Sequence, residues 1–102
     1  DLIILDPPAF AKHKKVLNNA LQGYRKLNAK AFEKIRPGGI LFTFSCSQVV
    51  SKENFRLAVF SAAAQSGRNV RILHQLTQPA DHPVNIYHPE GEYLKGLVLY
   101  VE

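Results

Sequence analysis

Short apolar runs alternate with longer amphipathic segments along this chain, and this pattern predicts strands separated by helices. Residues 1–6 and 40–46 contain the unbroken runs Leu2-Ile3-Ile4-Leu5 and Ile40-Leu41-Phe42-Thr43-Phe44. Runs that do not alternate with polar residues are typical of strands buried on both faces of a sheet. Two further runs, at 70–76 and 97–101, predict a third and a fourth strand.

Two segments have the periodicity of amphipathic helices. The first covers residues 16–36 and is ended by Pro37-Gly38-Gly39. The second begins after Ser51, a residue suited to cap a helix N-terminus, and stops at Gly67. The residues expected on the packing faces are Leu17, Leu21, Tyr24, Leu27 or Asn28, Ala31 and Ile35 in the first helix, and Phe55, Ala58, Val59, Ala62 and Ala63 in the second.

The order of the predicted elements indicates the fold class. Strands that alternate with helices pair in parallel through right-handed crossovers. The last two predicted strands are separated by a loop at 77–91 instead of a helix, so they can pair antiparallel. We therefore expect an α/β fold that forms half of a doubly wound sheet and ends in an antiparallel pair.

Composition restricts the class of protein. The chain has 102 residues, enough for one small domain, and its hydrophobic share of 46% argues against disorder. It has no methionine and opens inside a strand-like run, so we interpret it as a fragment of a longer protein. A single cysteine cannot form an internal disulfide, which fits the reducing cytoplasm. No apolar run approaches the ~20 residues that a membrane-spanning helix needs, so no membrane association is expected.

Charge favours an anionic partner. The formal net charge is +5 and the isoelectric point is near 9.6. Lys12, Lys14 and Lys15 form a basic cluster directly after the first predicted strand end. This cluster is either a solvated loop or a phosphate-binding segment. The histidines lack the spacing of metal ligands and only one cysteine is present, so no metal site is expected.

Candidate chemistry is concentrated where the first two strands end. Asp6-Pro7-Pro8-Ala9-Phe10 follows the first strand, and Ser45-Cys46-Ser47 follows the second. Ligands of open α/β sheets bind at the carboxyl ends of the strands. Asp6 can accept hydrogen bonds from an amino group or a ring N–H, the carbonyls beside Pro7 and Pro8 can accept from an exocyclic amine, and Phe10 can stack on a planar base. The alternative is that the acid and prolines only end a strand and that Phe10 fills the core.

The same strand end holds Cys46, the single cysteine. A free cysteine is often a small buried apolar residue. At a polar, partly exposed sheet edge it can instead act as a nucleophile. A thiolate that adds to C6 of cytosine makes C5 electron-rich, so that C5 can accept an electrophilic methyl group before a base removes the C5 proton and the thiolate leaves. An acid at the N3/N4 edge of the base, such as Asp6, would assist the addition.

These motifs resemble a known enzyme family. Asp6-Pro7-Pro8-Ala9-Phe10 is similar to motif IV of class I S-adenosylmethionine-dependent methyltransferases, and Ser45-Cys46-Ser47 is similar to the cysteine-containing motif VI of RNA cytosine-C5 methyltransferases. Essentially the whole chain resembles the bacterial 23S ribosomal RNA cytosine-C5 methyltransferases that carry an N-terminal PUA domain. Further segments that carry this resemblance are residues 23–28, 36–39, 80–84 and 89–96.

The resemblance implies a fold and a set of roles. Residues 1–102 would be the C-terminal half of a Rossmann-like catalytic domain, with strands four to seven in the order 4-5-7-6 and the last strand antiparallel. The nucleophile would be Cys46. The base would be held by Asp6, Pro7 and Pro8 in a pocket shaped by Phe10, and ribosomal RNA would contact Lys12, Lys14 and Lys15. A related RNA cytosine-C5 family has a second cysteine in motif IV that helps release the product. Here Pro8 stands in that region and no cysteine is present, so another base or water would do that work.

The resemblance also implies what lies outside the chain. The glycine-rich loop and the acid that bind S-adenosylmethionine would precede Asp1, and only the lip of the cofactor pocket, near Asp6 and Pro7, would be present. We therefore expect neither useful cofactor affinity nor activity from these residues alone. The first strand would leave an apolar open edge, through which the isolated chain is expected to self-associate.

Two other functions fit the sequence. Methylation of an exocyclic amine or of guanine N7 also uses Asp-Pro-Pro-type motifs but does not need Cys46. A non-catalytic RNA-binding or assembly module would depend on the basic cluster, and its binding would have a steep salt dependence. A truncated structural domain without a function of its own is the remaining interpretation of the isolated chain.

Overall fold

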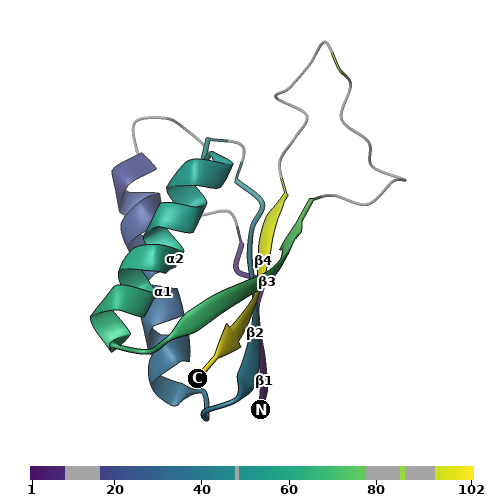
Figure 1. The fold of residues 1–102 in the computed structure, drawn as a ribbon. Coiled ribbons are helices and arrows are strands. Elements are labelled where there is room, and N and C mark those ends of the chain that lie inside the picture. The colour runs from purple at the N-terminus through teal and green to yellow at the C-terminus, as the bar shows by residue number, and fades with distance from the viewer. Residues whose placement is uncertain (9–16, 48, 78–85, 87–93) are drawn as a thin grey trace.

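A four-stranded sheet and two helices form a two-layer α/β structure (Figure 1). The computed structural model describes residues 1–8, 17–47, 49–77, 86 and 94–102. Both helices cover the same face of the sheet in Figure 1. The elements in chain order are β1 (Leu2–Leu5), α1 (Leu17–Lys34), β2 (Gly39–Ser45), α2 (Lys52–Ser66), β3 (Val70–Leu76) and β4 (Lys95–Val101).

The strands lie in the order β1-β2-β4-β3. The β1 and β2 strands are parallel, with Leu5 opposite Thr43, and β4 runs antiparallel to both of its neighbours. This arrangement confirms the expected α/β fold, including the 4-5-7-6 order and the antiparallel last strand. The last strand begins at Lys95, two positions earlier than the apolar run alone predicts.

Burial differs sharply between the two faces of the sheet. Along β2 every second residue from Gly39 to Ser45 faces the helices and is buried. The residues between them are half-buried. In β1, Leu2 and Ile4 are 60% and 62% exposed, while Ile3 and Leu5 pack against the core. The expectation that residues 1–6 form a strand buried on both faces is therefore wrong for this chain. Among the residues that the structure describes, only the helix layer covers β1, and it covers one face.

One side of α1 fills the core opposite β2. Tyr24 and Phe32 are fully buried, and Asn28, not Leu27, continues the buried stripe between them. Leu17 and Leu21, expected on this stripe, are half-buried and contact the core from its border. The helix ends before Pro37 as predicted. Gly38, which follows, has a positive φ of 86°, a conformation that glycine adopts without a steric penalty.

Both predicted ends of α2 are confirmed. The Ser51 hydroxyl accepts a hydrogen bond from the Asn54 N–H at 3.0 Å, which satisfies one of the N–H groups that a helix N-terminus leaves unpaired. Gly67 ends the helix in the left-handed conformation, with φ 72°. Within the described ranges, neither helix is long and apolar enough to cross a membrane.

Candidate functional site

The two strand ends that carry the candidate chemistry lie side by side. Because β1 and β2 are parallel neighbours with Leu5 opposite Thr43, their carboxyl ends reach the same edge of the sheet. Asp6 follows β1 directly, and Cys46 follows β2 directly. Asp6 and Pro8 are exposed, and Pro7 is half-buried. The structure therefore brings together the two motifs that the sequence places 40 positions apart.

The remaining predicted site residues lie outside the described part of the chain. Phe10 and the basic cluster of Lys12, Lys14 and Lys15 belong to the segment 9–16. Their roles remain predictions. No three His, Cys, Asp or Glu side chains are grouped as metal ligands in the ranges that the structure describes.

Cys46 sits between two fully buried serines. Its free thiol is half-buried, whereas Ser45 is 0% and Ser47 is 1% exposed. Burial thus keeps alternating past the end of β2, which places Cys46 on the side of the sheet opposite the helix layer. A partly accessible thiol flanked by rigid neighbours is a favourable position for a nucleophile.

Hydrogen bonds from the helix layer hold this segment in place. The Ser45 hydroxyl donates to the Tyr24 hydroxyl at 3.0 Å, and the Ser47 N–H donates to the Ser45 hydroxyl oxygen at 3.4 Å. The Tyr24 ring packs edge-on against Phe55 of α2, with centroids 5.6 Å apart and an interplanar angle of 86°. This contact restrains the Tyr24 ring and therefore the position of its hydroxyl group. The backbone around Cys46 is therefore anchored to both helices.

A lysine that sequence reasoning missed anchors the other flank of Cys46. Lys95 opens β4 directly opposite Ser45, is only 5% exposed, and donates a hydrogen bond from Nζ to the Ser47 carbonyl. That carbonyl also accepts the Val50 N–H at 3.3 Å. The available sequence signal was a charged residue at the start of an apolar run. Its contact with Ser47, 48 positions away, depends on the antiparallel register of β2 and β4.

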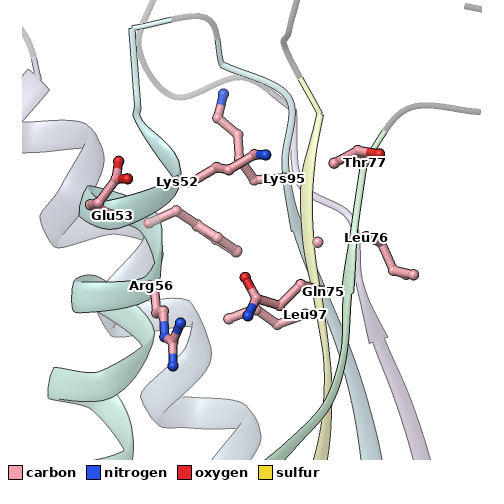
Figure 2. A pocket seen from close by; sticks show the side chains of 10 residues that line it. Lys52, Glu53, Arg56, Gln75, Leu76, Thr77, Lys95 and Leu97 are labelled. Atoms are coloured by element: carbon pink, nitrogen blue, oxygen red, sulfur yellow. The ribbon is translucent and has the colours of Figure 1, made fainter. Parts of the chain in front are cut away.

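A cavity of about 150 Å³ adjoins this lysine. It lies between the first turns of α2 and the neighbouring ends of β3 and β4 (Figure 2). Among the described residues that line it, three side chains are cationic and one is acidic, and the others are polar or apolar. The lining residues are Lys52, Glu53, Phe55, Arg56, Gln75, Leu76, Thr77, Lys95, Gly96 and Leu97.

Comparison with known proteins gives a consistent set of relatives. The chain is similar to large-subunit ribosomal RNA methyltransferases. It is 50% identical over 99 residues to ribosomal RNA large subunit methyltransferase I of Tolumonas auensis, a match that covers 97% of this chain and 25% of that protein. It is 46% identical over 101 residues to the protein of the same name from Shewanella amazonensis, covering 99% of this chain and 26% of the relative. The chain thus spans about a quarter of the length of the curated relatives that it matches. No protein-family model matches it.

Solved structures agree on the fold. A methyltransferase complexed with SAH superimposes with a TM-score of 0.81 at 24% identity, covering 99% of this chain and 26% of that structure. A SAM-dependent methyltransferase from Streptococcus mutans superimposes with a TM-score of 0.79 at 22% identity, covering 99% of this chain and 25% of that structure. The chain therefore shares the fold of these structures and forms part of a Rossmann-like sheet.

Proposed function

We propose that this chain is part of an S-adenosylmethionine-dependent methyltransferase that modifies C5 of a cytosine in large-subunit ribosomal RNA, with Cys46 as the nucleophile. The supporting observation is the position of Cys46. Its half-buried thiol follows β2 at the carboxyl edge of a parallel strand pair, beside the strand end that carries Asp6. Names of relatives that are 46–50% identical support large-subunit ribosomal RNA as the substrate.

The chemistry would proceed through a covalent adduct between Cys46 and the base. The thiolate sulfur forms a bond to C6 of cytosine, and the electron pair of the C5–C6 double bond moves so that C5 becomes nucleophilic. S-Adenosylmethionine, when bound, supplies the methyl group that C5 takes up. A base then removes the C5 proton, the C5–C6 double bond re-forms and the thiolate leaves. The described part of the chain has no second cysteine for the proton transfer, so water or another base performs it.

The end of β1 would contribute one rim of both the substrate and the cofactor sites. Asp6 is exposed and follows the carboxyl end of β1, the position at which open α/β sheets bind ligands. Its carboxylate can accept hydrogen bonds from the N3/N4 edge of cytosine, and Pro7 adds a half-buried apolar wall. These residues fit the lip of a cofactor pocket and do not by themselves supply a loop that holds the ribose or the methionine part of the cofactor. We propose that the chain alone neither binds S-adenosylmethionine usefully nor transfers a methyl group.

Covalent trapping tests the proposed function. The full-length protein that carries this chain is incubated with S-adenosylmethionine and transcribed large-subunit ribosomal RNA containing 5-fluorocytidine, whose C5 fluorine blocks the final elimination. Wild-type protein should give a denaturation-resistant protein–RNA adduct that mass spectrometry locates on Cys46, and Cys46→Ala should give none. The same transcript with ordinary cytidine is the control, because its adduct resolves. Methyl transfer that persists in Cys46→Ala would refute the proposal and favour methylation of an exocyclic amine or of guanine N7.

We also propose that the isolated chain self-associates through β1. Leu2 and Ile4 expose apolar surface, and the edge of β1 away from β2 has no strand partner in the described sheet. Sedimentation velocity over a range of concentrations should show species larger than a monomer. A single monomeric species at high concentration would contradict this proposal.

A further inference from the structure

We propose that Lys95 is a positioning residue for the proposed nucleophile. Together with Ser45 it fixes the two peptide units that follow Cys46, and it thereby governs how fast the thiol adds to the base. This inference rests on the proposed function, because it takes Cys46 as the group that attacks cytosine. It assigns a role in the reaction to a buried cation on the side of the sheet opposite the thiol.

The backbone at Cys46 lies beyond the reach of the strand pairing. The last residue of β2 that pairs with β4 is Ser45, and the last that pairs with β1 is Thr43. Cys46 therefore follows the final rung of both ladders. In the described part of the chain, the position of its backbone depends on the contacts of its neighbours and not on hydrogen bonds of the sheet.

Both peptide units that follow Cys46 are held on the helix side of the sheet. The Ser47 N–H, which belongs to the first unit, donates to the Ser45 hydroxyl oxygen at 3.4 Å. The Ser47 carbonyl, which belongs to the second unit, accepts from Lys95 Nζ and from the Val50 N–H at 3.3 Å. Neighbouring side chains of an extended segment point to opposite faces. Holding Ser45 and Ser47 towards the helices therefore directs the Cys46 thiol to the other face.

Lys95 is suited to hold the Ser47 carbonyl. It opens β4 directly opposite Ser45, so the β2–β4 register delivers its side chain to this place, and Figure 2 shows it between β4 and the start of α2. Lys95 is 5% and Ser47 is 1% exposed. A hydrogen bond from an ammonium group is stronger than one between neutral groups, and burial protects it from screening by salt. Of the two printed donors to this carbonyl, Lys95 therefore contributes more than the Val50 N–H.

A covalent nucleophile is sensitive to such an anchor. The sulfur must approach C6 of the base closely and in line with its π orbital, and a misplacement of about 1 Å can cost about 10²-fold in rate. Loss of the Lys95 contact releases the peptide unit on one side of Cys46 without removing the thiol. The expected effect is thus a slower chemical step at unchanged RNA affinity.

Kinetics of the full-length protein on transcribed large-subunit ribosomal RNA test this role. In Lys95→Met, which keeps an apolar stem but no donor, kcat for methyl transfer and the rate of adduct formation with 5-fluorocytidine RNA should fall by about 10–100-fold. The KM for RNA should stay within about twofold of wild type. Lys95→Arg keeps a charged donor, and the adjoining cavity of about 150 Å³ leaves room for the guanidinium, so this variant should recover most of the lost kcat.

A matched control destabilises the chain without touching the Cys46 segment. Arg68 is a second cationic side chain that donates to backbone carbonyls, those of Phe32 and Ile35. Both carbonyls lie at the end of α1, at the edge of the sheet away from Cys46. Arg68→Met should therefore keep the wild-type kcat at a temperature where the protein stays folded. Equal losses of kcat in Arg68→Met and Lys95→Met would attribute the effect to stability and overturn the inference.

Alkylation of the thiol gives a readout that does not depend on methyl transfer. Iodoacetamide is added to the free full-length protein, and peptide mass spectrometry follows the modification of Cys46. A looser segment exposes the half-buried thiol more often, so alkylation in Lys95→Met should be faster, by up to about tenfold for the loss of one hydrogen bond to a charged donor. Faster alkylation without any adduct in wild type would keep the positioning role and refute only the Cys46 chemistry.

The remaining outcomes concern the inference alone. An adduct in wild type, with kcat and alkylation unchanged in Lys95→Met, would overturn it and leave the proposed function intact. A raised KM for RNA at constant kcat would make Lys95 an RNA-binding residue and overturn the positioning role. Ser45→Ala releases the other peptide unit and serves as the test if Lys95→Met does not fold. It should lower kcat by about tenfold at constant KM, and an unchanged kcat would overturn the inference.

Discussion

The hydrogen bond between Tyr24 and Ser45 should contribute measurably to stability, because both groups are withdrawn from water. Each residue is 0% exposed and their hydroxyls are 3.0 Å apart. In Tyr24→Phe the Ser45 hydroxyl loses its acceptor inside the core, and a buried polar group left unpaired costs about 1–3 kcal/mol. In Ser45→Ala the Ser47 N–H, which donates to Ser45 at 3.4 Å, is also affected. We expect each single variant to lower the free energy of unfolding by about 1–2 kcal/mol.

A double-mutant cycle isolates this pair from all other contacts of the two residues. The variant Tyr24→Phe, Ser45→Ala should be less destabilised than the sum of its single variants by about 1 kcal/mol, because the bond can be lost only once. Urea unfolding of the chain at low concentration, followed by far-ultraviolet circular dichroism, gives these free energies. With an m-value of about 1–2 kcal/mol/M, the coupling corresponds to roughly 0.5–1 M in the unfolding midpoint.

The control for the cycle is Tyr100→Phe. Tyr100 is half-buried on β4, and its hydroxyl makes no hydrogen bond to another residue that the structure describes. Its loss should change the free energy of unfolding by less than about 0.5 kcal/mol. Strict additivity of the two single variants, or an equally large effect of Tyr100→Phe, would show that the Tyr24–Ser45 bond does not anchor the Cys46 segment.

Two further substitutions test the packing that surrounds the site. In Gly96→Ala the new Cβ would lie 2.7 Å from the Phe44 ring, so the ring must move. Thermal unfolding should show that the free energy of unfolding falls by about 1–3 kcal/mol. An unchanged unfolding midpoint would mean that the ring shifts freely. Arg68 donates to the carbonyls of Phe32 and Ile35, each at 2.7 Å, and thereby satisfies the C-terminal end of α1. Arg68→Met should lower the free energy of unfolding by about 2–3 kcal/mol in urea unfolding, and full stability would exclude this capping role.

The elements of this fold could be predicted from the sequence because their signals are local. Both ends of α2 depend on single residues, Ser51 and Gly67, whose backbone preferences act within one turn. The parallel pairing of β1 and β2 follows from the helix between them, since a crossover of that kind has one hand and one pairing direction. For the same reason the sequence predicts that Asp6 and Cys46 lie at one edge of the sheet.

Sequence patterns did not predict burial correctly where the burial of an element depends on the elements packed against it. An unbroken apolar run predicts two covered faces for β1. Within the described part of the chain only the helix layer covers this strand, and Leu2 and Ile4 are exposed. Similarly, helical periodicity left Leu27 and Asn28 as alternatives. The orientation of α1 against β2 selects Asn28, whose side-chain amide donates to the Tyr24 carbonyl at 2.8 Å. A local pattern indicates which face is apolar, but not how much of that face a neighbouring layer covers.

The amino-acid sequence by itself determined the order of strands and helices, their capping residues and the two motifs at the strand ends. Only the tertiary structure decided that Lys95 supports the backbone after Cys46, that Tyr24 supports Ser45, and that Lys52 and Arg56 meet Lys95 around one cavity. These groups are brought together by the antiparallel register of β2 and β4 and by the packing of helices on the sheet. Register and packing minimise the free energy of the whole chain, so residues that are far apart in sequence acquire their roles only when the sheet has formed.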